Sequence, residues 1–167
     1  MRSMSLIGMP GSGKSSVGRI LAARLGWNFL DTDLCIEERH GMALQALIDR
    51  VGDQSFRCIE EETVLSLAPG GPAVISTGGS VIYSERGMRH LAALSAVIYL
   101  DATLEAIRSR IAAEAPRGIV GMTDGGLERL YQERLPYYRR YASLTVTLDC
   151  ETPEEAASKI LSELACQ

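Results

Sequence analysis

The stretch Gly8-Met-Pro-Gly-Ser-Gly-Lys-Ser15 matches the phosphate-loop pattern G-x-x-x-x-G-K-[ST]. A strand-like apolar run over residues 4–7 precedes it, and apolar residues at helical spacing over residues 13–25 follow it. Glycines let successive backbone N–H groups turn toward phosphate oxygens, and the N-terminus of the following helix attracts the same anion. A glycine-rich turn with a solvent-facing lysine would also fit this stretch, but the flanking strand and helix favour a phosphate loop.

Two side chains of this loop carry the expected chemistry. Lys14 can reach the β- and γ-phosphates of a nucleotide as a compact point charge, and the Ser15 hydroxyl can ligate Mg²⁺. The chain has only one other lysine, Lys159, so a lysine at this position indicates a role that a planar guanidinium cannot fill. The N-K-x-D pattern of guanine-specific switches is absent, because no lysine follows the single asparagine, Asn28. ATP is therefore the expected nucleotide.

The chain has 167 residues, the size of one domain, and short β-branched runs alternate with longer helical patterns. We therefore expect a single α/β domain over residues 1–167, with a mostly parallel sheet and helices on both faces. Pro136 should kink or divide the helix that contains it. The expected strands are residues 4–7, 28–30, 73–76, 96–100 and 144–148. The expected helices are residues 13–25, 34–39, 44–51, 54–68, 85–94, 104–113, 127–141 and 153–164.

Two stretches interrupt the alternation of strands and helices. Residues 34–68 contain more helix than one crossover needs, and residues 114–126 are irregular and rich in glycine. Long irregular stretches within a compact domain usually serve a function. We expect an acceptor-binding insert over residues 33–61 and a mobile lid over residues 113–126.

Composition and charge exclude several classes of protein. The net charge of -4 argues against sequence-independent nucleic-acid binding, which depends on excess positive charge. No apolar run is long enough to span a bilayer, and the N-terminal run is too short for a signal peptide. The four cysteines lie far apart, which is typical of free thiols in a reducing compartment. We expect a cytoplasmic monomer that binds small molecules, with no nucleic-acid or membrane partner.

Two groups of acids are candidates for the metal site. Asp31 and Asp33 follow the second expected strand, and extended residues two positions apart point the same way, so both carboxylates can enter one cleft. Asp101 ends the fourth expected strand, where an acid often lies beside a nucleotide-bound metal. Each could instead cap the helix that follows. The pattern alone does not choose between Asp31 and Asp101.

Arginines and a glycine pair complete the candidate site. Arg117 lies in the expected lid, where a cation can neutralise charge on a transferring phosphoryl group. Arg57 could grip an anionic substrate through bidentate hydrogen bonds, or form only a helical ion pair with Glu60 or Glu61. Gly78-Gly79 leaves backbone open to a ligand, or forms a simple turn.

Together these segments resemble the shikimate kinase family, a P-loop group related to nucleoside monophosphate kinases. The resemblance covers nearly the whole chain and rests on Gly8–Ser15, Phe29–Glu37, Phe56-Arg57 with Glu60 and Glu61, Ser76–Gly79, Arg117, and Glu133–Tyr138. It implies a three-layer α/β/α P-loop kinase fold with a five-stranded parallel sheet in the order 2-3-1-4-5. It also implies that ATP donates its γ-phosphoryl group to the 3-hydroxyl of shikimate, with Mg²⁺ as cofactor.

The resemblance implies a role for individual residues. Catalysis would involve Lys14, Asp33 and Arg117. ATP would be bound by Gly11, Ser12, Gly13, Lys14, Ser15, Ser16, Arg110 and Arg117. Shikimate would be bound by Asp33, Arg57, Gly78, Gly79 and Arg134. Ser15 would ligate Mg²⁺ with Asp31 nearby, which favours Asp31 over Asp101.

The chain departs from the family pattern at two positions. Ser80 replaces the third glycine after the third strand, and Gly118 replaces the proline after Arg117. Ser80 adds a Cβ and a hydroxyl beside the acceptor site, and Gly118 loosens the expected lid. Three alternatives therefore stay open: a related kinase for another carboxylate-bearing alcohol, an ATP-binding regulatory module with little turnover, and a nucleoside monophosphate kinase.

Overall fold

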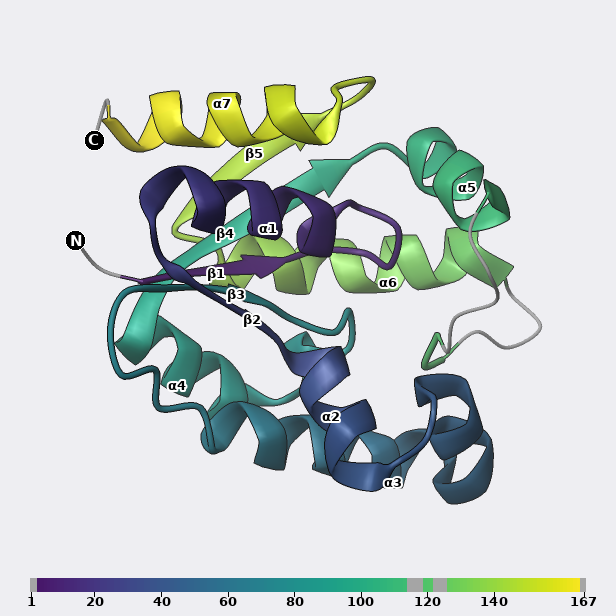
Figure 1. Ribbon diagram of the computed structural model, residues 1–167. Coiled ribbons are helices and arrows are strands. Elements are labelled where there is room, and N and C mark those ends of the chain that lie inside the picture. Colours follow the sequence, from purple (N-terminus) through teal and green to yellow (C-terminus); the bar gives the residue numbers. More distant parts are fainter. Residues whose placement is uncertain (1–2, 114–118, 122–125, 166–167) are drawn as a thin grey trace.

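The computed structural model describes residues 3–113, 119–121 and 126–165 of the chain (Figure 1). A parallel sheet of five strands in the order β2-β3-β1-β4-β5 forms its centre. The strands are β1 (Ser3–Ile7), β2 (Asn28–Asp31), β3 (Ala73–Ser76), β4 (Ser95–Ala102) and β5 (Leu144–Leu148). The predicted P-loop kinase sheet order is confirmed.

Seven helices and one 3₁₀ turn fall within the described residues. They are α1 (Lys14–Leu25), α2 (Thr32–His40), α3 (Leu44–Leu65), η1 (Val81–Tyr83), α4 (Glu85–Leu94), α5 (Leu104–Ala113), α6 (Gly126–Tyr141) and α7 (Pro153–Ala165). Two helices were predicted where α3 lies, and Gly52 separates them with a non-helical φ of 79°. Pro136 lies inside α6, which is one helix rather than two. Among the residues that the structure describes, no helix is long and apolar enough to cross a bilayer.

Neighbouring strand residues face opposite sides of the sheet, and this alternation builds the two main cores. Leu6 and Ile98 pack with residues of α1 and α7, while Ile7 and Tyr99 pack with residues of α3, α4 and α6. The helices therefore form a layer on each face of the sheet (Figure 1). β1 and β3, in the middle of the sheet, are buried along their whole length, as expected for a parallel sheet covered by helices.

A third, smaller core holds the predicted insert together. Ile36 of α2 packs with Leu47, Ile48 and Phe56 of α3, and Val120 joins them from the segment before α6. This core places α2 and α3 beside the carboxyl ends of the strands. The functional bounds of the insert and of the lid stay predictions, and residues 114–118 and 122–125 lie outside the described structure.

Candidate active site

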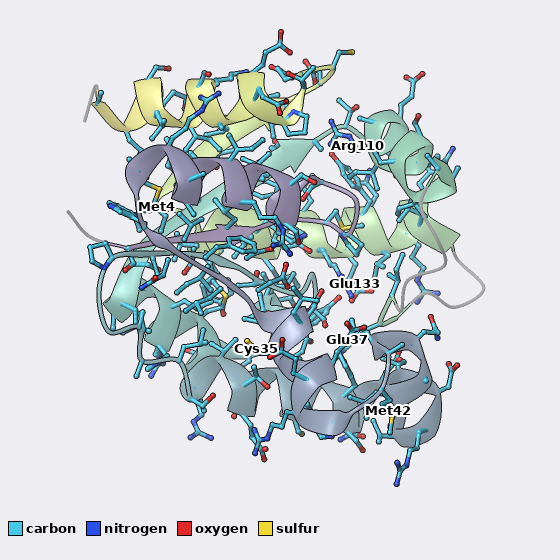
Figure 2. The ribbon with its side chains drawn as sticks, viewed as in Figure 1. Met4, Cys35, Glu37, Met42, Arg110 and Glu133 are labelled. Carbon is cyan, nitrogen blue, oxygen red and sulfur yellow. The ribbon has the colours of Figure 1, made fainter. Side chains whose placement is uncertain are left out.

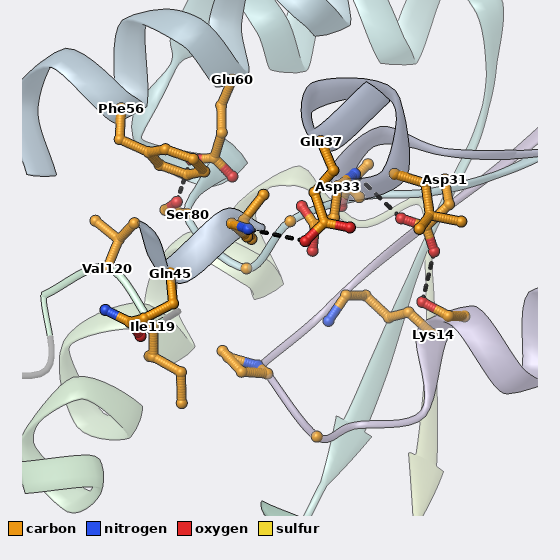
Figure 3. Close-up of a pocket in the computed structure, with 18 of the residues that line it drawn as sticks. Lys14, Asp31, Asp33, Glu37, Gln45, Phe56, Glu60, Ser80, Ile119 and Val120 are labelled. Atoms are coloured by element: carbon orange, nitrogen blue, oxygen red, sulfur yellow. Dashed lines mark hydrogen bonds between the residues drawn. The ribbon is translucent and has the colours of Figure 1, made fainter. Parts of the chain in front are cut away.

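A pocket of about 340 Å³ lies where β1, β2 and β3 end (Figure 3). The carboxyl edge of a parallel sheet is the usual place for ligands in this class of fold. The phosphate loop, α2, α3, the turn after β3, two residues before α6 and one residue of α6 form its wall. The predicted site residues in this wall are Gly11, Gly13, Lys14, Ser15, Ser16, Asp31, Asp33, Gly78, Gly79 and Arg134.

The phosphate loop is held in a curved conformation around Lys14. Gly11 and Gly13 have φ values of 78° and 93°, which favour glycine because other residues rarely adopt them. The Lys14 ammonium donates hydrogen bonds to the carbonyls of Gly8 (2.9 Å) and Met9 (2.8 Å) and is buried. Its charge is therefore fixed within the loop, beside the N-terminus of α1, which itself attracts anions.

Arg110 reaches the same loop from α5. Its Nη1 donates to the Gly11 carbonyl at 3.4 Å, which places the guanidinium next to the phosphate loop (Figure 2). Arg110 is thus positioned to meet a nucleotide bound there. Arg117, which was predicted to contact the nucleotide from the lid, lies outside the described residues.

The two predicted metal-binding residues are in contact. The Ser15 hydroxyl donates to Asp31 Oδ2 at 2.7 Å, and Asp31 Oδ1 accepts from the Asp33 backbone N–H at 3.1 Å (Figure 3). Asp31 therefore caps α2 with one oxygen and faces Ser15 with the other. Asp101 instead accepts from the Tyr99 hydroxyl at 2.9 Å and lies away from the pocket wall, so the structure favours Asp31.

This oxygen pair fits a magnesium ion completed by a substrate. Within the described residues, no three His, Cys, Asp or Glu side chains form a cluster that could hold a metal. Mg²⁺ commonly binds one or two protein oxygens and takes its other ligands from substrate phosphates and water. Ser15 and Asp31 supply such oxygens beside the phosphate loop.

A side chain at position 78 or 79 would have to displace neighbouring groups. A Cβ at Gly78 would collide with a carboxylate oxygen of Glu60 and lie 2.8 Å from Asp33 Oδ1. A Cβ at Gly79 would lie 2.9 Å from Arg134 Nη1. The turn after β3 therefore brings backbone into close contact with three charged side chains, as a ligand-binding turn does.

Glu60 is a pocket residue to which the sequence assigned no site role. It is 4% exposed and accepts a hydrogen bond from the Ser80 hydroxyl (Figure 3). Burial raises the pKa of the Glu60 carboxyl to about 7, against the lowering effect of the Ser80 hydrogen bond. The nearby Asp33 raises this pKa, and Arg134 lowers it. In the sequence, the only hint that Glu60 belongs to the site is its position one helical turn after Arg57. That spacing also fits an ordinary ion pair on a helix surface.

The two predicted carboxylate-binding arginines lie near each other but differ in setting. Arg134 is 1% exposed, lines the pocket, and donates from Nη2 to the Val120 carbonyl at 2.6 Å. Arg57 lies with its guanidinium carbon 4.0 Å from the centre of the Tyr83 ring and is not part of the pocket wall. The structure thus brings Arg134 into the pocket wall and places Arg57 outside that wall, against the Tyr83 ring.

Comparison with known proteins agrees with the fold. The family model described as shikimate kinase matches residues 10–165. The shikimate kinase of Thermobifida fusca is 39% identical over 160 residues, which cover 95% of this chain and 92% of that protein. The shikimate kinase of Paracidovorax citrulli is 40% identical over 149 residues, or 87% of this chain and 81% of that protein.

Solved structures agree with the sequence comparison. Shikimate kinase from Acinetobacter baumannii, in complex with shikimate, has a TM-score of 0.87 and 29% identity, covering 99% of this chain and 94% of that one. Shikimate kinase from Aquifex aeolicus has a TM-score of 0.81 and 27% identity, and the match covers 98% of this chain and 96% of that one. The chain belongs to the shikimate kinase family.

Proposed function

We propose that this protein transfers the γ-phosphoryl group of ATP to the 3-hydroxyl of shikimate. The observation that carries the proposal is a single pocket that joins the phosphate loop to an acceptor wall. Lys14 lies on the first side, and Asp33 and the buried Arg134 lie on the second. Phosphoryl transfer depends mainly on positioning and on charge stabilisation, and this pocket supplies both.

On the nucleotide side, Lys14 and the N–H groups at the start of α1 hold the β- and γ-phosphates. Arg110 approaches from α5 and donates to the Gly11 carbonyl of the loop. Ser15 and Asp31 would hold Mg²⁺, which when bound neutralises phosphate charge. A contribution of Arg117 to the transferring group stays a prediction from the sequence.

On the acceptor side, Asp33 orients the attacking hydroxyl and takes its proton as the new phosphate ester bond forms. Arg134 binds the carboxylate of shikimate, with Arg57 beside it, because planar guanidinium groups match a carboxylate in two hydrogen bonds. Gly78 and Gly79 line the pocket, where their backbone can face the ring of the acceptor. A monomeric state and a cytoplasmic location also stay predictions from the sequence.

A coupled assay of ADP release with Mg·ATP tests the proposal, with shikimate, quinate and homoserine as separate acceptors. We expect release that depends on shikimate and a product mass one phosphate larger than shikimate. Lys14→Met should reduce the rate by about a hundredfold or more, the scale for removing one group that stabilises developing charge. Normal turnover by this variant would contradict the phosphate-loop assignment. ATP binding without transfer to shikimate would instead favour another acceptor or a regulatory role.

A further inference from the structure

Tyr83, the last residue of η1, contacts both arginines assigned to the acceptor carboxylate. The guanidinium carbon of Arg57 lies 4.0 Å from the centre of the Tyr83 ring, and that of Arg134 lies 5.4 Å from it. The ring of Tyr137 packs against Tyr83 edge-on, with ring centres 5.6 Å apart. Tyr83 is thus a shared support for two cations that come from different helices, α3 and α6.

The Tyr83 hydroxyl extends this support through hydrogen bonds. It donates to Glu133 Oε1 at 2.5 Å and accepts from Arg134 Nε at 3.4 Å. A hydroxyl has one hydrogen and two lone pairs, so donation to Glu133 leaves the oxygen able to accept from Arg134. Glu133 therefore sets the direction of the hydroxyl, and the hydroxyl sets the orientation of the Arg134 guanidinium.

Contact with a ring face suits an arginine that must still bind a substrate. A cation–π contact takes up none of the N–H donors of a guanidinium in hydrogen bonds, so those donors can still bind a carboxylate. Arg57 Nε is buried and makes no hydrogen bond within the described part of the chain. A Cβ placed on Gly121 would lie 3.9 Å from Arg57 Nη2 and 4.0 Å from Arg134 Nη2, so an outer nitrogen of each guanidinium lies next to this glycine.

We infer that Tyr83 is a positioning residue that holds Arg57 and Arg134 in the arrangement that binds the acceptor carboxylate. This inference rests on the proposed function, because that function supplies the carboxylate. Tyr83 acts through its ring on Arg57 and through its hydroxyl on Arg134, and it does not line the pocket itself. Its contribution therefore falls on acceptor binding rather than on ATP binding.

Steady-state kinetics of Tyr83→Leu and Tyr83→Phe test this inference. Tyr83→Leu removes both the ring contact and the hydroxyl, and the KM for shikimate should rise about five- to thirtyfold. Tyr83→Phe keeps the ring and its packing, and the same KM should rise about two- to tenfold. The KM for ATP should stay unchanged in both variants, a split that a general loss of folding would not produce.

Two controls separate positioning from structural support. Tyr141→Leu removes another tyrosine that contacts an arginine, Arg140 at 5.6 Å, outside the pocket wall, and should leave the KM for shikimate unchanged. Shikimyl alcohol, which has a hydroxymethyl group in place of the carboxylate, should show the same KM with wild type and Tyr83→Leu.

The outcomes distinguish this inference from the proposed function. Wild-type turnover of shikimate with an unchanged KM in both folded Tyr83 variants would overturn the inference alone. An equal rise of KM for shikimate and for the alcohol would also overturn it, because the carboxylate would not be involved. If the wild type does not phosphorylate shikimate, both the proposed function and the inference are overturned.

Discussion

The hydroxyl of Ser80 donates a hydrogen bond to the Glu60 carboxylate, and both side chains are buried in the wall of the acceptor pocket. The backbone of Ser80 has a φ of −94°, so serine is accommodated there without strain. Its hydroxyl hydrogen already forms a hydrogen bond with Glu60, so this group does not depend on a bound ligand for a hydrogen-bond partner. This departure from the family's third glycine therefore adds an ordered contact to the pocket.

Glu60 should make the stability of the protein depend on pH near neutrality. Its pKa is raised by burial from 4.5 to about 7 in the folded state. The stabilisation from this raised pKa is fully present below pH 4.5 and is lost as the pH rises through about 7. Over the whole pH range, the contribution of Glu60 to the free energy of unfolding changes by about 3 kcal/mol, as expected for a pKa shift of this size.

Denaturant unfolding between pH 4.5 and 8 checks this, with wild type and Glu60→Gln compared at each pH. The glutamine keeps the size of the side chain and an oxygen that accepts from Ser80. Relative to this variant, the free energy of unfolding of the wild type should fall as the pH rises. If the difference in the free energy of unfolding between wild type and Glu60→Gln is the same at every pH, Glu60 does not titrate in this range.

Ser80→Ala should destabilise the protein more at alkaline than at acidic pH. The Ser80 hydrogen bond lowers the pKa of Glu60, so its loss costs most when Glu60 is charged. We expect a loss of about 1.5–3 kcal/mol at pH 8 and a smaller loss at pH 5, since hydrogen bonds to charged groups are the stronger ones. Ser80→Thr keeps the hydroxyl and serves as the control. If Ser80→Ala lowers the free energy of unfolding by the same amount at both pH values, Ser80 does not form a hydrogen bond with an ionised Glu60.

Asp31→Asn should increase the Mg²⁺ concentration needed for half-maximal activity by about tenfold or more, because the variant removes a charged oxygen ligand. Asparagine is a good helix N-cap, so the bond to the Asp33 N–H can be kept and α2 should stay folded. Asp101→Asn is the matched control, since Asp101 lies near the carboxyl end of β4 and away from the pocket wall. A Mg²⁺ requirement changed by Asp101→Asn and not by Asp31→Asn would reverse the assignment of the metal site.

Arg134→Lys should raise the KM for shikimate by about tenfold or more while the KM for ATP stays unchanged. Lysine keeps the charge but cannot form two parallel hydrogen bonds with a carboxylate. Arg139→Lys is the control on the same helix, because that side chain is 60% exposed, lies 3.9 Å from the Asp101 carboxylate, and is not part of the pocket wall. Kinetic constants for shikimate that match the wild type in Arg134→Lys would place the carboxylate elsewhere in the pocket.

Most of the fold follows from local sequence pattern. The apolar strands, the helical spacing and the phosphate loop are signals within a few neighbouring residues, and the structure confirms each of them. Asp31 and Asp33 also lie in one pocket, but not as two residues of an extended segment, because Asp33 already belongs to α2 and Asp31 caps that helix. The sheet order came from the family resemblance, because the pattern along one strand does not record which strand lies beside it.

Contacts between distant parts of the chain were not available from local pattern. Ser80 meets Glu60 across 20 residues, and Tyr83 meets Glu133 across 50. Local pattern likewise could not say whether Asp31 or Asp101 lies beside Ser15 at the candidate metal site, because this depends on which strands are neighbours. Local backbone preferences are set by neighbours in sequence, so they can be read from composition and spacing. The direction and pKa of a buried side chain are set by the charges and volumes packed around it, and only the folded chain brings these together.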